Sequence, residues 1–559
     1  MCKRLLWAGI VAVWLAAAQT PPEMILSGGK IVTVDRNFSY AQAIAITGGK
    51  IVAVGSNEEI RKLAGPATRR IDLGGKTVIP GLADNHLHSA GGGPGVDLSR
   101  VRTMPELIAA IVARVKTAQA GDVVITNSDW HEAQLKEQRL PLRNDLDKVA
   151  PETPVVVIRG GHEYILNSAA LKKWNITRET PEPSGGSISR YENGELNGEL
   201  VDAAKSLVRL PAPPAKDLES RIKDQQEEYR TLNAAGLTSV RHPGAPAEQY
   251  RLLKEMERRG LLTMRVNFLI RLNGAKDPEA VRKTVASWNV APDDGDAWLR
   301  IWGVKLGIDG GFEGGWMTRP YEEPYGKGGT YSGLQLIPQD TYTMIVKELN
   351  RLGWRVGTHA VGDAAIDEVL AGYEAANQDK SIAGRRWAIE HAFIPRTEHF
   401  DRINRLGVQI AAQDHLYVAG PSLRKYWGEQ RANWVTPVRS YLDHKVHISA
   451  GTDAPVVPYP PLWVIYHFIT RDTISGGVFG PGERISRQEA LQLSTIDNAY
   501  LNFEEDSKGS LEAGKYADLV VLSGDIMTCA EKDIPNLTIL LTMVNGRIVF
   551  QHERFRPAA

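Results

Sequence analysis

The apolar and polar positions divide the chain into stretches with different periodicity. In residues 24–80, short runs rich in Val and Ile are separated by Gly-Gly-Lys, as in GGKIVTV and GGKIVAV, which indicates strands joined by tight turns. Residues 504–559 repeat this style, with Asn545-Gly546 as a turn signal between two apolar runs. We therefore predict that 24–80 and 504–559 together form one small β-sandwich domain, so that the residues between them are a single inserted unit.

The inserted unit, residues 81–503, alternates apolar runs with amphipathic helical segments such as 339–352 and 363–377. The apolar runs are GDVVITN, PVVVIRG, GLTSVRHP, LTMRVNFLIR, LRIWGVKLGIDGG, WRVGTHAVG, RWAIEHAFI, GVQIAAQ and KVHISAGTDAP. This repeated strand–helix pattern predicts an α/β fold with a parallel sheet, for which a (β/α)₈ TIM-like barrel is the most common closed arrangement. An open doubly wound sheet is the alternative, although no Gly-rich phosphate-binding motif follows the first strand. Residues 129–200, rich in Gly, Pro and polar side chains, are predicted to be a lobe inserted over the barrel mouth.

The N-terminus has the pattern of a secretory signal. Lys3 and Arg4 precede LLWAGIVAVWLAA, an apolar run of about 13 residues that is too short for a typical membrane span, and an Ala-rich segment follows. We expect cleavage after Ala18, which would make residues 1–18 a signal peptide and the mature protein periplasmic or secreted, with no stable membrane span. An uncleaved N-terminal anchor is the alternative. Cleavage would remove Cys2 and leave Cys529 as the single cysteine, so neither a disulfide nor a cysteine metal site is expected within one chain.

Charge composition bears on the kind of partner. The 66 basic residues balance the 66 acidic residues, so no net field favours nucleic acid or an anionic membrane. A small-molecule substrate is therefore expected, with no nucleic acid partner. The sequence is compatible with a homo-oligomer and with a monomer.

Candidate chemistry lies where the apolar runs of the inserted unit end, because barrel enzymes place their sites at the carboxyl ends of the strands. Side chains able to bind or bridge a divalent metal occur at six such positions: His86, His88, Lys305, His359, His391 and Asp453. Imidazole and carboxylate ligands suit zinc or a similar ion in the absence of thiolates. A His-x-His pair alone is weak evidence, because chance gives roughly 0.3 such pairs in a chain with this histidine content.

Lys305 has two interpretations. A neutral lysine beside metal ions can react with CO₂ to give a carbamate, whose two oxygens can bridge two ions. A buried lysine held in an ion pair is the alternative. The residues alone do not decide between them.

Several motifs, taken in order, resemble those of the amidohydrolase superfamily. They are PGLADNHLHS, GVKLGIDG, GTHAVGDAAID, AIEHAF and SAGTDAPV. The segments GGHEYILNSAAL and KGSLEAGKYADLVVL extend the resemblance over nearly the whole mature chain, and they favour the branch labelled amidohydrolase 3, which includes N-substituted formamide deformylases.

The resemblance implies a metal-dependent hydrolase with one or two divalent ions, zinc being expected. By this resemblance His86, His88 and Asp453 bind one ion, His359 and His391 bind a second, and carboxylated Lys305 bridges them. The metal-activated water is the nucleophile, and Asp453 acts as general base and then as general acid.

Five further residues are candidates for substrate contact, with hydrogen bonding or packing as the alternative role: His162, Asn167, His242, Gln413 and His415. Glu390 is expected to be a structural residue or to hydrogen-bond a metal ligand without binding the metal itself. Asp309, Asp363 and Asp367 are expected to cap helices or pair with arginine.

The sequence thus predicts an exported metal-dependent hydrolase that cleaves a non-peptide C–N bond, either an amide or an N-acyl bond. The alternatives are hydrolysis of an ester or lactone, and a non-catalytic exported protein that binds a metal or ligand. Deamination is disfavoured, because deaminases of this superfamily usually lack the lysine found here at 305 and carry a glutamate where HAVGDAA has Asp363.

Overall fold

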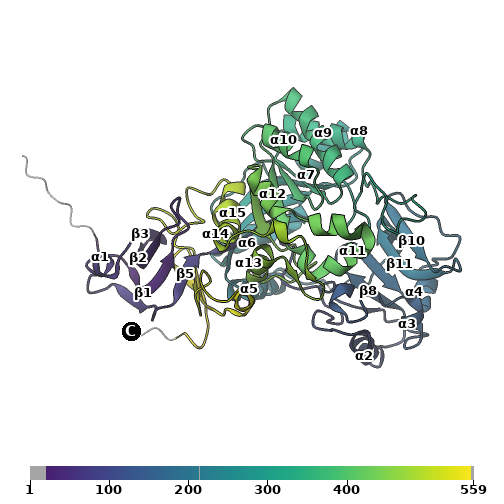
Figure 1. Ribbon diagram of the computed structural model, residues 1–559, viewed down its shortest axis with the longest axis horizontal. Helices are drawn as coiled ribbons and strands as arrows, with labels where there is room; N and C mark the ends of the chain where they lie inside the picture. The colour runs from purple at the N-terminus through teal and green to yellow at the C-terminus, as the bar shows by residue number, and fades with distance from the viewer. Residues whose placement is uncertain (1–19, 213–214, 556–559) are drawn as a thin grey trace, which may run out of the picture.

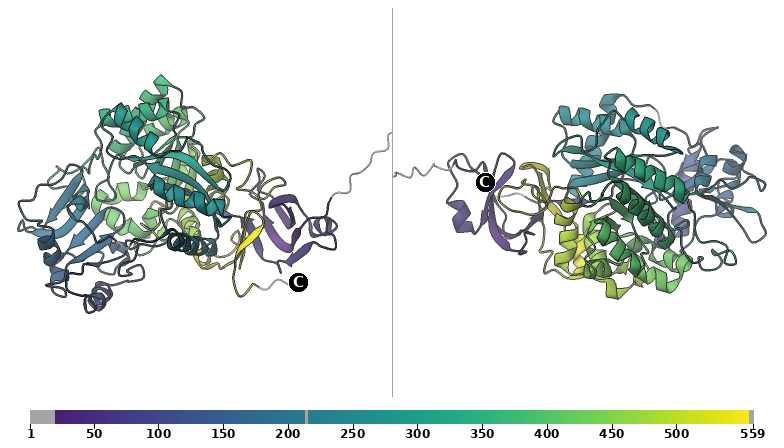
Figure 2. Two further views of the ribbon diagram at one scale, coloured as in Figure 1. Left: turned by 180° about the vertical axis from the view of Figure 1, so that it is seen from behind. Right: turned by 90° about the horizontal axis from the view of Figure 1, so that it is seen from above.

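The computed structural model describes residues 20–212 and 215–555. The signal segment predicted at residues 1–18 lies outside the described residues. Three bodies follow one another along the long axis of the molecule: a sheet built from both chain ends, a barrel, and a lobe (Figures 1 and 2). None of the helices within the described ranges is long and apolar enough to cross a membrane.

The two ends of the chain build one eight-stranded sheet, in which β5 pairs with β1 on one side and with the C-terminal strand β21 on the other. Its strands are β1 (Met24–Val32), β2 (Tyr40–Thr47), β3 (Lys50–Gly55), β4 (Arg69–Asp72), β5 (Thr77–Pro80), β21 (Leu519–Leu522), β22 (Ile539–Val544) and β23 (Arg547–Gln551). Alternate side chains from both ends, such as Leu26 and Leu541, share one buried apolar cluster, as the matching strand patterns of the two ends predict.

The inserted unit contains the predicted barrel. Eight parallel strands run in the order β6, β12, β13, β14, β15, β16, β17 and β18, and the Asn85 N–H, just after β6, donates to the Ala450 carbonyl of β18 at 3.2 Å to close the ring. The strands are β6 (Leu82–Asp84), β12 (Leu237–Ala245), β13 (Arg265–Arg271), β14 (Leu299–Gly307), β15 (Val356–Ala360), β16 (Ala388–His391), β17 (Gln409–Gln413) and β18 (Ile448–Gly451).

Amphipathic helices surround the barrel and bury their apolar faces against it. They are α5 (Leu218–Ala234), α6 (Ala247–Arg258), α7 (Pro278–Ser287), α8 (Gln339–Arg351), α9 (Asp363–Asp379), α10 (Thr397–Leu406), α12 (Val438–Asp443), α13 (Pro461–Thr470), α14 (Arg487–Leu493) and α15 (Ile496–Leu501). A further helix, α11 (His415–Trp434, broken at Gly428), buries its apolar side chains in a separate cluster with Phe312, Met317 and Tyr321. Helices α8 and α9 match the two amphipathic segments singled out in the sequence.

The lobe is a five-stranded sheet of its own, in the order β10, β11, β9, β8 and β7. Its elements are α2 (Met104–Val115), β7 (Val124–Ile125), α3 (Arg143–Asp147), β8 (Val155–Arg159), β9 (Glu163–Leu166), α4 (Ser168–Lys173), β10 (Gly186–Arg190) and β11 (Leu196–Asp202). The runs GDVVITN and PVVVIRG therefore supply lobe strands and not barrel strands. The sheet also begins before residue 129, where the lobe was expected to start.

The shorter elements are α1 (Asn57–Arg61), the two-stranded ribbon β19 (Asp472–Thr473) and β20 (Gly477–Val478), and four short 3₁₀ segments, Glu132–Gln134, Ala203–Leu207, Pro481–Glu483 and Glu531–Asn536. The segment Ala203–Leu207 directly follows β11, and there the chain leaves the lobe sheet and runs back toward the barrel.

Candidate metal centre

Three of the predicted ligands come together where β18 meets the segment after β6. The Asp453 N–H donates to the His86 carbonyl at 2.6 Å, and the His88 N–H donates to the Ala454 carbonyl at 2.8 Å. These backbone bonds place Asp453 Oδ1 3.4 Å from His86 Nε2 and 3.1 Å from His88 Nε2. The Oδ1 atom is buried and accepts no hydrogen bond among the described residues. A carboxylate oxygen therefore faces two imidazole nitrogens across a gap that only a small group can fill.

The ring of His86 is oriented by a hydrogen bond at Nδ1, the nitrogen that faces away from Asp453. Its Nδ1 lies 2.7 Å from Glu390 Oε2, which also accepts from Arg241 Nη1 at 2.8 Å; in the same ion pair, Arg241 Nη1 lies 2.7 Å from Glu390 Oε1. Because a carboxylate only accepts, the proton of His86 is on Nδ1 and the lone pair is on Nε2. Burial, together with the charge of Lys305, lowers the pKa of His86 to about 3. The ring is thus neutral with its lone pair directed at the gap, as metal-binding histidines supported by a carboxylate are arranged.

Lys305 lies beside the nitrogen of His86 that carries the lone pair. Its Nζ is 3.3 Å from His86 Nε2, and its side chain is buried. Burial lowers the pKa of Lys305 to about 7, so a substantial fraction of the amine is neutral near physiological pH. A neutral amine is the form that can react with CO₂.

The other two predicted histidine ligands lie next to this group. The rings of His391 and His86 are 4.7 Å apart between centroids, and those of His391 and His359 are 4.6 Å apart. His391 Nδ1 donates to Gln413 Oε1 at 2.6 Å, and His359 Nε2 donates to the Gly310 carbonyl at 3.1 Å. Each histidine therefore keeps one nitrogen with a free lone pair, Nε2 in His391 and Nδ1 in His359.

Two of the predicted ligands have strained backbones. The φ angles of His391 and Asp453 are +74° and +61°, a region that costs a residue with a side chain about 1 kcal/mol or more. Such strain is typical of residues that must point a side chain in one direction. In both cases the residue ends or follows a barrel strand and faces the metal centre.

Among the five residues predicted to contact substrate, His162 lines the cavity above the site, and His415 lines a smaller adjoining pocket beside Asp453. His162 stacks on His359 with ring centroids 5.6 Å apart and donates from Nδ1 to Asp202 Oδ1 at 2.5 Å. His415, the first residue of α11, lies 3.0 Å from Asp453 Oδ2 through its Nε2. His415 also forms a group with His391 and Asp453 whose ligand atoms lie within 4.8 Å of one another.

The structure gives the other three residues different roles. Asn167 is buried in the lobe, where its side chain caps α4 and bonds four backbone groups. Gln413 lies behind His391, with Nε2 donating to Asn85 Oδ1 and to the Ala411 carbonyl. His242 Nδ1 donates to the Leu87 carbonyl at 2.8 Å, and its ring packs beside His88. These contacts match the alternative role given in the sequence analysis, hydrogen bonding or packing, and substrate contact by Asn167, Gln413 and His242 stays a prediction.

The acidic residues that follow the strands also have identifiable partners. Asp309 accepts backbone N–H groups of Val361, Gly362 and Trp316. Asp363 pairs with Arg396, and Asp367 pairs with Arg396 and Arg402. These are backbone-bonding and arginine-pairing roles of the kind expected from the sequence.

A cavity of about 680 Å³ opens above the metal centre between the barrel and the lobe. Its wall includes His86, His88, Lys305, His359, His391 and Asp453, which the sequence singled out, and Asp202, Lys205 and Arg271, which it did not. Arg271 could have been found, because it closes the run LTMRVNFLIR just as Lys305 closes the next strand. Asp202 and Lys205 come from the lobe, and the expectation that sites lie at the carboxyl ends of barrel strands does not apply there.

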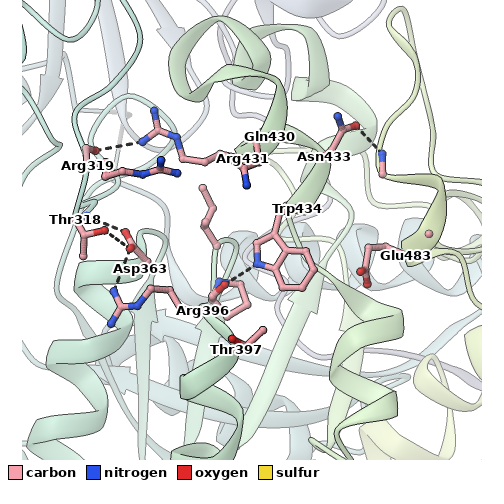
Figure 3. Close-up of a pocket in the computed structure, with 14 residues that line it drawn as sticks. Thr318, Arg319, Asp363, Arg396, Thr397, Gln430, Arg431, Asn433, Trp434 and Glu483 are labelled. Atoms are coloured by element: carbon pink, nitrogen blue, oxygen red, sulfur yellow. Dashed lines mark hydrogen bonds and ion pairs between the residues drawn. The ribbon is translucent and has the colours of Figure 1, made fainter.

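Another cavity, of about 630 Å³, lies on the outer side of α11 (Figure 3). Two of its arginines are already engaged: Arg396 pairs with Asp363, and Arg431 donates to the carbonyls of Arg319 and Pro320. Trp434 donates to the Pro395 carbonyl at 2.6 Å. This cavity contains none of the histidines of the metal centre.

The donor set fits a divalent metal. His86, His88 and Asp453 have one ligand atom each, all within 4.8 Å of one another, and the unpartnered Asp453 Oδ1 is one of them. Neutral imidazoles with a carboxylate are the ligands that zinc and similar ions take in catalytic sites. A further group, His131, Glu132 and Glu313, surrounds Arg159, whose guanidinium bonds Glu132, Glu163 and Glu313. In this second group, the guanidinium of Arg159 occupies the position between the carboxylates and supplies the positive charge that a metal ion would bring.

Comparison with known proteins agrees with this geometry. The model of the amidohydrolase family matches residues 69–550. The chain is 30% identical to the N-substituted formamide deformylase of Arthrobacter pascens, over 95% of this chain and 98% of that protein, and 27% identical to the putative amidohydrolase YtcJ of Bacillus subtilis, over 94% and 99%. Among solved structures, an uncharacterized metal-dependent hydrolase from Pyrococcus furiosus matches with a TM-score of 0.64 and 26% identity, over 90% of this chain and all of that one.

The barrel, its histidine and aspartate ligands and the family match over most of the length lead to one assignment. The chain belongs to the amidohydrolase family and is a metal-dependent hydrolase acting on carbon–nitrogen bonds other than peptide bonds.

Proposed function

We propose that this protein hydrolyses an amide or N-acyl bond of a small molecule, with zinc or a similar divalent ion bound by His86, His88 and Asp453. The observation that carries the proposal is the position of the Asp453 carboxylate. It is buried between His86 and His88 on one side and His415 on the other, with one oxygen unpartnered. The match to a formamide deformylase over nearly the full length of both chains supports an N-acyl substrate.

A divalent ion in this site would polarise the scissile carbonyl and lower the pKa of water. The protein residues supply the rest. Glu390 fixes His86, and Gln413 fixes His391, each by holding the N–H on the nitrogen that faces away from the gap. Asp453 is the group placed to take a proton from the attacking water and return it to the leaving nitrogen, so that the C–N bond breaks to give a carboxylic acid and an amine.

Lys305 and the two outer histidines bear on the number of ions. We propose that the neutral amine of Lys305 can react with CO₂, releasing a proton, and that His359, His391 and the resulting carbamate would hold a second ion beside the first. The low pKa of Lys305 and its distance of 3.3 Å to His86 Nε2 support this.

We also propose that the protein is exported, on the basis of the basic, apolar and Ala-rich order of residues 1–18. N-terminal sequencing of the protein from a fractionated native host tests this. Recovery outside the cytoplasm with a new N-terminus after Ala18 is expected, and an intact Met1 in the cytoplasmic fraction would refute it.

Amine release from a panel of N-alkyl formamides and N-acetyl amines tests the reaction. The protein is prepared with bicarbonate and with zinc, cobalt or manganese, and Asp453→Asn is the inactive control. We expect amine release that depends on metal and is lost in Asp453→Asn. Turnover of esters or lactones without any amide turnover would overturn the proposal, and an active Asp453→Asn would mean that Asp453 is not the proton-transferring group.

A further inference from the structure

Two cationic side chains reach the cavity above the metal centre without an acidic partner. Arg271 ends β13 on the barrel side, and Lys205 lies in the 3₁₀ segment that returns from the lobe. Neither forms an ion pair with a carboxylate within the portion of the chain that the structure describes. A pair of unmatched cations in a substrate cavity calls for an anion from outside the protein.

The guanidinium of Arg271 is anchored through one nitrogen only. Its Nε donates to the Gly244 carbonyl at 3.2 Å. It also lies flat against Gly244, where a Cβ would be 3.0 Å from Nη2 and where φ is +81°. The glycine thus leaves space for the guanidinium, and Nη1 and Nη2 form no hydrogen bond with the described residues. The planar fork that these nitrogens make is the geometry that binds a carboxylate through two parallel bonds.

Arg271 is also close to the reacting groups. In the barrel it is the register partner of Lys305 on β14, and neighbouring strands lie about 4.8 Å apart. Burial lowers the pKa of Arg271, and the negative charge of Asp453 opposes that shift. An anion bound by Arg271 would therefore belong to the same small molecule whose carbonyl lies at the metal centre.

Lys205 faces the cavity from the opposite wall. Its Nζ donates to the Gly161 carbonyl and lies 5.3 Å from the centre of the Tyr164 ring. An ammonium group has three donors, so two remain for a ligand or water. Lys205 therefore adds a positive charge on the lobe side, and the neutral Gly161 carbonyl that accepts from it does not balance that charge.

The acidic groups on the cavity wall contact groups other than Arg271 and Lys205, although one oxygen each of Asp202 and Asp453 accepts no hydrogen bond from the described residues. Asp202 accepts from His162, and Asp309 accepts from three backbone N–H groups. Asp453 is held between histidines. None of the three forms an ion pair with Arg271 or Lys205, so the outer part of the cavity favours a negative ligand.

We propose that the substrates are amides that carry a carboxylate, such as N-acyl amino acids, and that Arg271 binds this carboxylate while Lys205 contributes charge from the lobe. This inference rests on the proposed amide hydrolysis and names its substrate class. Arg271 is then a specificity-determining residue that discriminates charged from neutral amides.

Matched substrate pairs test the proposal in the metal-loaded protein. N-formyl and N-acetyl derivatives of glycine, β-alanine and 4-aminobutyrate are compared with their carboxamides, which lack only the charge. We expect a higher kcat/KM for at least one acid than for its carboxamide. Arg271→Met should lower kcat/KM for that acid roughly 10- to 100-fold more than for the carboxamide, the range expected for a lost charged hydrogen bond. Arg271→Lys, which keeps the charge but not the fork, should fall between.

The control is Arg251→Met, which removes an exposed arginine on α6 and should leave the ratio of acid to carboxamide unchanged. Equal kcat/KM for every acid and its carboxamide would overturn the proposal. So would an Arg271→Met variant that loses both members of a pair equally.

A binding measurement separates this inference from the proposed reaction. Dicarboxylates from succinate to pimelate and monocarboxylates of matched length are titrated calorimetrically into the same metal-loaded proteins. We expect the second carboxylate to increase affinity in the wild type and not in Arg271→Met. If no amide is hydrolysed but this difference is found, the reaction is wrong and the anion site stands. If the second carboxylate adds no affinity, or if its effect survives Arg271→Met, the anion site is refuted whatever the enzyme hydrolyses.

Discussion

Replacing Glu390 with Gln should weaken metal binding although Glu390 is not predicted to touch the metal. The side chain is fully buried, its Oε2 accepts from Arg241 Nη1 at 2.8 Å and lies 2.7 Å from His86 Nδ1, and its Oε1 lies 2.7 Å from Arg241 Nη1. Gln keeps the size of the side chain but removes its charge and replaces one accepting oxygen with an N–H donor. Arg241 then loses its counter-charge, and the Gln amide nitrogen faces the donor of either Arg241 or His86.

The structure allows the cost to be estimated. Arg241 is fully buried and stacks on Trp302 at 4.0 Å, and its Nε and Nη2 have no other partner among the described residues. Leaving such a charge uncompensated costs about 3–5 kcal/mol. Loss of the bond that orients a metal-binding histidine typically weakens metal affinity about 10- to 100-fold. Glu390→Gln should therefore show both effects.

Two assays measure these effects separately. Denaturant unfolding of the metal-free protein gives the stability change without a contribution from metal binding, and competition with a fluorescent zinc chelator gives the metal affinity. Asp518→Asn is the matched control, because Asp518 makes a buried pair with Arg265 at 2.7 Å between the terminal sheet and the barrel. It should lose a similar amount of stability and bind metal normally. A Glu390→Gln protein that is less stable but binds metal like the wild type would refute the role assigned to Glu390.

Three further predictions follow from neighbouring groups. Gly357→Ala would place a Cβ 2.3 Å from Glu390 Oε1, so metal affinity should fall although every ligand remains; unchanged affinity in the chelator assay would contradict this. Lys305→Ala should lower the metal content measured by elemental analysis, whereas Lys305→Glu should largely retain it, and equal content in both variants would exclude the bridging role. Burial raises the pKa of Glu368 from 4.5 to about 7. Between these pH values the folded state keeps a proton that the unfolded state loses. The free energy of unfolding should therefore fall by up to about 3 kcal/mol as pH rises from 4.5 to 7. Glu368→Gln should flatten that part of the stability–pH curve, and an unchanged slope would argue against the shift.

The barrel, and the meeting of most of the candidate ligands, could be predicted because both depend on local patterns. Each ligand ends or follows an apolar run, and closure of a parallel barrel brings the carboxyl ends of its strands together. His86, His391 and Asp453 therefore meet in the structure although more than 360 residues separate the first from the last. The resemblance to amidohydrolases added the order of the motifs, which no single pair of histidines could supply.

Roles that depend on side-chain direction could not be predicted. Gln413 ends a strand as the ligands do, yet its side chain is buried behind His391. Asn167 lies in a polar lobe segment that looks suited to a pocket, but it caps α4. The sequence indicated Glu390 as a supporting residue, but not that it contacts His86 and Arg241, because these residues come from strands that are not neighbours in the chain. Arg271 also ends a strand, but a guanidinium does not bind a metal ion, so the pattern of metal-binding residues does not include it.

The central claim is that His86, His88 and Asp453 hold a catalytic divalent metal. Elemental analysis of the purified protein, prepared with bicarbonate and dialysed without chelator, tests it most directly, with His88→Ala and Asp453→Asn measured beside the wild type. The account predicts at least one zinc or similar divalent ion per chain in the wild type, and clearly less in both variants at the same folded concentration. A wild-type protein without stoichiometric metal, or variants that retain the full wild-type content, would contradict it.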